Sequence, residues 1–203
     1  MINTDSSFYG QQADERILYV VKPHSLSTVI KLLKVYTISF FVFIAFYSVG
    51  SLLPNYKGLI SLLALALGAL MVGLGSKLVT DNQKKNLAYL TDRRIVRFEP
   101  TTFFATNIRT LSWDEVVKVK TFSPNMLWKQ LAIGSVVVHA RTPTRPDNVE
   151  GSLGSVDDIH LTDVYLYRDV GNYIDKILFT YKRKPKEVAE IHPFIPKPMG
   201  QRY

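Results

Sequence analysis

The chain of 203 residues contains no cysteine, which excludes disulfide bonds, thiolate metal sites and cysteine nucleophiles. Its four histidines, His24, His139, His160 and His192, show neither HxxxH nor HExxH spacing. The sequence also lacks a Gly-rich phosphate loop and a GxSxG motif. These absences predict a protein that is not an enzyme, with no catalytic residues, no metal, no cofactor and no small-molecule substrate.

Charge is missing from two long stretches, Val35 to Leu53 and Gly58 to Ser76. At about 1.5 Å per residue, each would reach roughly 28 Å as a helix, close to the hydrocarbon thickness of a bilayer. Core helices of soluble proteins are also apolar on all sides, but the second stretch offers almost nothing for water to hydrate. A cleaved signal peptide is an alternative for the first stretch, although a long segment with acids and bases precedes it. Both stretches are predicted to span a membrane.

The short segment between the two stretches, Pro54 to Lys57, consists of turn-forming and interfacial residues. It predicts a helical hairpin with both chain ends on the same side of the membrane. Lysine and arginine are concentrated before the first stretch and after the second, whereas the turn carries only Lys57. By the positive-inside rule, both termini of this integral membrane protein are predicted to be cytoplasmic.

After the hairpin, apolar and polar residues alternate in the segments IVRFE, VVKVKTF and SVVVHAR. This period predicts antiparallel strands with one face in water, for example with Val96 and Phe98 opposite Arg97 and Glu99. Val117 and Val119 are expected to share a face in the same way.

A helical period follows near the end of the chain. One apolar stripe predicts an amphipathic C-terminal helix that packs on the sheet; it consists of Val170, Ile174, Ile177, Leu178 and Tyr181. The predicted fold class is therefore α+β: a transmembrane helical hairpin followed by a small curved antiparallel sheet or partial barrel, capped by that helix.

Three segments of the second half carry a family resemblance: LAYLTDRRIVRF, RTLSWDEVVKVK and SPNMLWKQLAIGSVVVHA. With the hairpin before them, they resemble the bacterial membrane-flanked pleckstrin-homology-like (PH-like) domain family over roughly residues 15 to 182. Thr91 to Arg94 match the first hairpin motif of that family and Gly134 matches a later strand approach, whereas Leu111 to Trp113 depart from the usual Pro-Leu. The resemblance implies a PH-like barrel in a bacterial inner membrane. Such barrels are mostly non-catalytic and bind lipid headgroups, peptides or partner domains through loops and strand edges.

Together these patterns predict four parts of the chain. They are an N-terminal cytoplasmic segment (1–25), the transmembrane hairpin (26–79), the PH-like domain (80–184) and a Pro-rich tail (185–203).

Four basic residues near the end of the hairpin are candidates for binding lipid or a partner: Lys84, Lys85, Arg93 and Arg94. The first β-hairpin begins only about ten residues after the second span, so it could return to the membrane surface and meet anionic headgroups. A purely structural alternative makes Asp92 and Arg93 the turn of that hairpin, with the Arg94 guanidinium on the wet face or paired to a nearby acid such as Asp92.

The tail combines closely spaced prolines with apolar residues, which favours an extended segment. Phe194 and Ile195 are predicted to dock on a partner or back on the barrel; disorder is the alternative. The net charge of +8 would suit nucleic acid. No nucleic-acid partner is expected, however, because an RNA-stacking strand signature and a recognition helix are lacking.

The sequence thus predicts a non-enzymatic membrane-anchored PH-like adaptor or scaffold. It would bind a protein partner, or a second copy of itself, at the cytoplasmic face, with secondary contacts to membrane lipids. The alternative is an integral accessory subunit of a larger membrane complex, in which small residues of the second span pack on other spans.

Overall fold

A computed structural model describes residues 7–101, 105–141 and 158–196. The chain divides into two compact units, a helical unit (Ser25–Lys85) and a β unit that combines Met1–His24 with Asn86–Tyr203. The residues before the hairpin therefore fold together with those after it. The helical unit extends to Lys85, beyond the boundary at residue 79 that the apolar pattern suggests.

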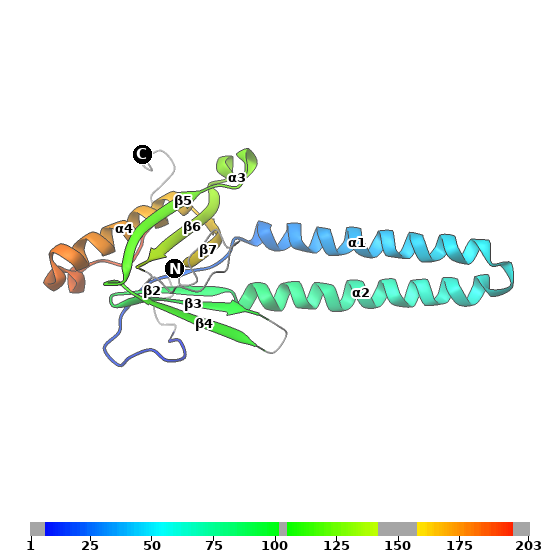
Figure 1. The fold of residues 1–203 in the computed structure, drawn as a ribbon, viewed down its shortest axis with the longest axis horizontal. Helices are drawn as coiled ribbons and strands as arrows, with labels where there is room; N and C mark the ends of the chain where they lie inside the picture. Colours follow the sequence, from blue (N-terminus) through cyan, green and yellow to red (C-terminus); the bar gives the residue numbers. More distant parts are fainter. Residues whose placement is uncertain (1–6, 102–104, 142–157, 197–203) are drawn as a thin grey trace, which may run out of the picture. The chain divides into compact units, whose positions relative to one another are not determined.

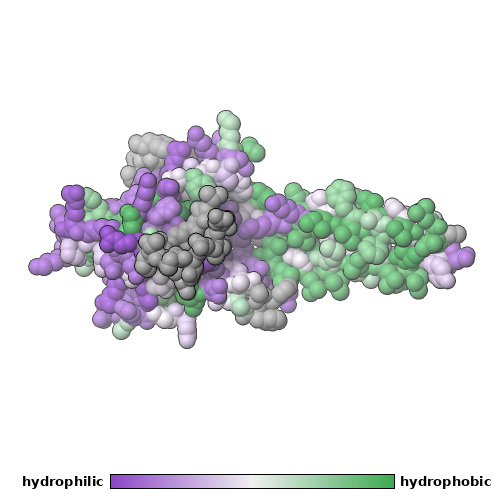
Figure 2. Space-filling view, in the orientation of Figure 1, coloured by the Kyte–Doolittle hydropathy of each residue, from purple (hydrophilic) through white to green (hydrophobic). Residues whose placement is uncertain are grey.

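The helical unit is a pair of long helices joined by a single 3₁₀ turn (Figure 1). Its elements are α1 (Ser25–Leu52), η1 (Pro54–Tyr56) and α2 (Lys57–Lys85). Both helices are long and apolar enough to cross a membrane. Their surface is predominantly apolar, whereas the β unit shows a mostly polar surface in the same view (Figure 2).

Small residues let the two helices approach each other closely. A Cβ atom added to Gly75 would lie 2.6 Å from Val35 Cγ1, and one added to Gly50 would lie 2.9 Å from Ile60 Cγ2. Ala64 is almost completely buried. Part of the small-residue face that the alternative function would offer to other spans is thus used inside the hairpin, whereas Gly73 has no atom within 4 Å of an added Cβ.

The β unit contains two antiparallel sheets, which confirms the predicted α+β class. The four-stranded sheet has the order β1-β2-β3-β4, and its strands are β1 (Ile17–Val21), β2 (Leu87–Thr91), β3 (Arg94–Pro100) and β4 (Thr106–Ser112). The three-stranded sheet consists of β5 (Val116–Phe122), β6 (Ile133–Ala140) and β7 (Ile159–Tyr165). The described strands form these two open sheets rather than one closed barrel.

Three helical elements complete the unit (Figure 1): α3 (Met126–Gln130), α4 (Tyr167–Arg183) and η2 (Pro185–Glu190). Helix α3 lies between β5 and β6 in the chain. Helix α4 packs against β5 and β6, with Val170, Ile174 and Ile177 fully buried.

Both sheets and α4 share one apolar core. Leu90 and Ile95 enter it from the first sheet, and Val136 and Val138 from the second. Trp113, between β4 and β5, is completely buried, and its indole N–H donates a 3.0 Å hydrogen bond to the carbonyl of Thr91. This tryptophan therefore links the turn of the first sheet to the junction between the sheets.

The faces of β3 differ from the predicted wet and dry faces. Arg97 is only 9% exposed and lies on the core side together with Ile95, because side chains two residues apart share a face. The other face is covered as well: Phe8 from the N-terminal segment stacks on Tyr89 at 4.7 Å and packs on Val96. The sequence predicts the alternation of side chains along β3 correctly, but no pattern in β3 itself shows that Phe8 covers its outer face.

The prediction that Val117 and Val119 lie on the same face of β5 is wrong. The register shifts between Val116 and Lys118, so Val116 is buried while Val117 is 54% exposed. An extra residue of this kind moves the following side chains to the opposite face.

Candidate functional site

The four basic residues singled out in the sequence fall into two groups. Lys84 and Lys85 are the last residues of α2 in the helical unit. Arg93 and Arg94 lie at the turn between β2 and β3 in the β unit. The structure shows what the two arginines contact.

Arg94 binds a buried acid of the N-terminal segment. Its Nε donates to Glu15 Oε1 and its Nη2 to Glu15 Oε2, each over 2.8 Å, and Nη2 also donates to the Gly10 carbonyl at 2.7 Å. The side chain of Glu15 is fully buried and that of Arg94 is 20% exposed. Arg94 is thus paired with an acid, but the acid is Glu15 and not Asp92.

The environment of Glu15 favours its charged form. Burial by itself raises the pKa of the Glu15 carboxyl, but hydrogen bonds from Arg94, from the Gln12 N–H and from Thr91 outweigh it and lower the pKa below its ordinary value. The hydrogen bonds that Arg94 donates to Glu15 raise the pKa of Arg94 in turn. The pair is therefore ionised at neutral pH.

The neighbouring residues hold the same segment. Arg93 donates to Gln12 Oε1 at 2.7 Å, and Asp92 exchanges hydrogen bonds of 3.1 Å with the backbone of Arg16. In the described structure, the turn between β2 and β3 therefore fixes the N-terminal segment to the first sheet.

The two tail residues behave differently from each other. Phe194 is 6% exposed and packs on Tyr19 and Tyr173, with ring centroids 4.7 and 5.2 Å away. Its N–H donates to the Leu18 carbonyl at 3.1 Å. Ile195 is 70% exposed. Phe194 therefore docks back on the β unit, whereas Ile195 points away from it.

These contacts cover one edge of the four-stranded sheet. β1 is an edge strand, and the tail lies along it through Phe194 and through Arg16, which donates to the carbonyls of Val188 and Ile191. The other sheet has a shorter contact of this kind at one end of its β7 edge. Pro23 forms a bridge with Val164 in β7, and the next N–H along the chain donates to Asp163.

The remaining two edges, β4 and β5, differ in chemistry. β5 carries the exposed lysines Lys118 and Lys120, a common protection against unwanted strand pairing. β4 has the sequence TNIRTLS, and its single charged residue, Arg109, is held by Glu99 at 3.2 Å. Proline is absent from β4, which leaves this edge without the usual protection.

The hydrogen-bond pattern shows which groups of β4 face outward. Backbone bonds join Trp113 to Arg93 and Thr101 to Ala105, so the residues of β4 that bond to β3 are the odd-numbered ones. The N–H and C=O groups of Thr106, Ile108 and Thr110 therefore point away from β3. Within the described part of the chain they have no partner on that side. Ile108 is also 47% exposed.

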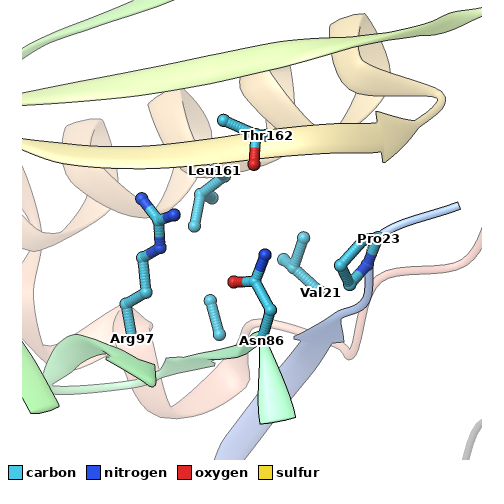
Figure 3. A pocket seen from close by; sticks show the side chains of 7 residues that line it. Val21, Pro23, Asn86, Arg97, Leu161 and Thr162 are labelled. Carbon is cyan, nitrogen blue, oxygen red and sulfur yellow. The ribbon is translucent and has the colours of Figure 1, made fainter. Parts of the chain in front are cut away.

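A small hollow lies between the sheets of the β unit (Figure 3). It is lined by Val21, Pro23, Asn86, Ala88, Arg97, Leu161 and Thr162, and Figure 3 shows the Arg97 side chain reaching across it toward Leu161. Its volume of about 10 Å³ is room for one water molecule. Burial lowers the pKa of Arg97, although Glu99 Oε1 at 3.0 Å favours its charge. The hollow does not have the size of a substrate site.

Among the residues that the structure describes, no group of three or more His, Cys, Asp or Glu could hold a metal ion. His139 Nδ1 lies 2.8 Å from Asp158 Oδ2, and Asp158 also accepts the Ala140 N–H at 3.0 Å. This pair ties the end of β6 to the start of β7.

Sequence reasoning did not single out β4. The signal was present, because TNIRTLS lacks both lysine and proline, but edge position depends on sheet order and is not visible in the strand itself.

Comparisons of the chain with protein-family models, with curated proteins and with solved structures gave no match. The resemblance to the PH-like family therefore stays a prediction from its motifs.

Proposed function

We propose that this chain is a non-enzymatic, membrane-anchored adaptor with a PH-like β unit, whose β4 edge binds an extended segment of a partner protein at the cytoplasmic face of the membrane. The observation that carries the proposal is the contrast among the sheet edges. The chain's own segments bond to β1 and to one end of β7, and β5 carries lysines, whereas among the described residues nothing bonds to the outward backbone groups of β4 and the strand has no lysine.

Strand addition explains how such an edge recognises a partner. An extended peptide can pair with the outward N–H and C=O groups of Thr106, Ile108 and Thr110, and main-chain bonds supply affinity while alternate side chains supply specificity. Ile108, half exposed on this strand, offers an apolar contact for one of those side chains. The partner segment should therefore be extended, with an apolar residue opposite Ile108.

The helical hairpin compensates for the modest affinity of an edge contact of this kind. Two helices long enough to span the bilayer hold the β unit at the membrane, so a partner in the same membrane meets it at a high effective concentration. An edge contact of modest affinity is then sufficient.

Lipid contacts are secondary in this proposal. Lys84 lies about 12 Å along α2 from Ser76, at 1.5 Å per residue, while a headgroup layer extends roughly 5–8 Å from the hydrocarbon. The long side chains of Lys84 and Lys85 can still lean toward anionic headgroups. Arg94 contributes little, because Glu15 already occupies its guanidinium.

Site-specific photocrosslinking tests the proposal. A photoreactive residue at position 108 in the full-length chain should crosslink one partner protein in native membranes, and mass spectrometry should map the crosslink to an extended segment. A synthetic peptide of that segment should then bind the purified chain. The variant Ile108→Lys, which adds a charge to the edge, should weaken this binding at least tenfold.

Val117→Lys is the matched control, because Val117 is an exposed β-branched residue on the other open edge strand. It should leave peptide binding unchanged. Equal weakening by both variants would contradict the proposal, as would crosslinks from position 108 only to a second copy of the chain.

A further inference from the structure

Helix α3 and its flanking residues expose an unusual amount of apolar surface. Met126 is 75% exposed, Leu127 71%, Phe122 51% and Leu131 49%. We call these four residues the α3 patch. Clustered apolar side chains of this kind on a water-exposed surface mark an interaction site.

The α3 patch belongs to an ordered turn. Asn125 caps the helix by accepting the Trp128 N–H at 2.9 Å, and Ser123 Oγ donates to the carbonyls of Asn125 and Ile133 at 3.1 and 3.2 Å. Local hydrogen bonds therefore hold the apolar side chains outward, and the core does not use them.

The chain segment that carries the patch has charges of one sign. From Val116 to Ala140 the chain contains Lys118, Lys120 and Lys129 but no aspartate or glutamate. Apolar side chains, a tryptophan and lysines without acids are the combination that suits an anionic bilayer surface.

The position of helix α3 within the β unit also favours a bilayer surface as the binding partner of the α3 patch. Ile133, directly after the α3 turn, pairs with Tyr165 at the end of β7, and Leu166 donates to Ala132 at 2.7 Å. At that end of β7, Pro23 bridges Val164, just before the chain continues into α1. The α3 turn and the last residues before α1 in the chain therefore contact the same end of β7.

We infer that the α3 patch inserts into the interfacial layer of the anionic membrane that the hairpin crosses. The contact fixes the orientation of the β unit on the bilayer, in addition to the tether. This inference rests on the membrane anchor of the proposed function, but it does not depend on the β4 edge.

The tryptophan content of the chain gives a direct test. There are two tryptophans, and one of them, Trp113, is completely buried in the core, whereas Trp128 lies in α3. The full-length chain is reconstituted in vesicles of phosphatidylcholine and phosphatidylglycerol, with brominated or ordinary acyl chains. Brominated acyl chains should quench a substantial part of the tryptophan emission, and the variant Trp128→Phe should abolish this quenching.

Paired variants separate insertion from general effects. Met126→Glu with Leu127→Glu changes only exposed side chains, and it should remove the quenching of Trp128 while the chain stays folded. The matched control is Phe179→Glu, since Phe179 is a similarly exposed apolar residue on α4, at 55%. It should leave the quenching unchanged.

Two results would overturn the inference. Absence of quenching in the wild-type chain would mean that the polar ends of α1 and α2 hold α3 above the headgroups, or that α3 binds a protein. Equal quenching in pure phosphatidylcholine would remove the role of the lysines.

The anchor is tested separately, so that its failure can be distinguished. Because the chain lacks cysteine, Asn55→Cys and Ile195→Cys each give a single thiol. A membrane-impermeant maleimide added outside intact cells should label position 55 in the turn but not position 195 in the tail. If the maleimide labels only position 55 and Trp128 is still not quenched, the inference about the α3 patch fails while the membrane anchor stands.

Discussion

Two parallel hydrogen bonds of 2.8 Å join the guanidinium of Arg94 to the fully buried carboxylate of Glu15. The pair joins the turn after β2 to a segment that lies on the other side of the hairpin in sequence. The pair explains why the turn contains an arginine. The side chain neutralises a buried acid, a role that a contact with lipid headgroups would not fill. Thr91 adds a hydrogen bond to the same carboxylate at 2.8 Å.

Arg94→Ala should destabilise the β unit by about 3 kcal/mol, because it leaves the Glu15 charge buried without its partner. Arg93→Ala is the control. Arg93 is half exposed and its ion pair with Asp14 spans 4.0 Å, so its loss should cost less than about 1 kcal/mol. Urea unfolding of the full chain in detergent, followed by tryptophan fluorescence, measures both. Similar losses of unfolding free energy for the two variants would show that the buried Arg94–Glu15 pair contributes no more to stability than the exposed contacts of Arg93.

The same pair predicts a pH dependence of stability. The pKa of Glu15 is lowered from 4.5 in the folded chain, so its contribution is fully present above pH 4.5 and is lost as the pH falls through the lowered pKa. Glu15→Gln should therefore be less stable than wild type at pH 7, and the difference should shrink as the pH falls below 4.5. Unfolding free energies at pH 7, 5, 4 and 3 measure it. A difference that stays constant to pH 3 would contradict the lowered pKa.

The tail offers a pair of adjacent residues with opposite burial. Phe194→Ala should cost about 3 kcal/mol, because it removes a buried ring from between Tyr19 and Tyr173. Ile195→Ala should change stability by less than about 0.5 kcal/mol, since Ile195 is 70% exposed. Urea unfolding compares the two, and limited proteolysis should release the tail only in the Phe194 variant. Equal effects would mean that the tail does not dock on β1.

Several features of the fold could be predicted from local patterns. The two uncharged stretches indicated the helices, and alternation indicated the antiparallel strands, because helix and strand periods are written directly in the sequence. The helical stripe around Ile174 gave the buried face of α4.

The candidate site could be predicted only in part. Sequence motifs drew attention to Arg93 and Arg94, but the partner of Arg94 is seventy-nine positions away in the chain, across both apolar helices. The β5 bulge was missed because a register shift depends on the neighbouring strand. The edge position of β4 was missed because it depends on sheet order.

By itself, the amino-acid sequence determined the two apolar helices, the antiparallel strands and the absence of thiol chemistry, since these follow from composition and from periods of a few residues. Tertiary structure alone decided that Glu15 neutralises Arg94, that Phe194 docks on the β1 edge, and that β4 is an edge strand. Each of these depends on which distant segments meet, and long-range contacts are set by the packing of the whole β unit rather than by any local pattern.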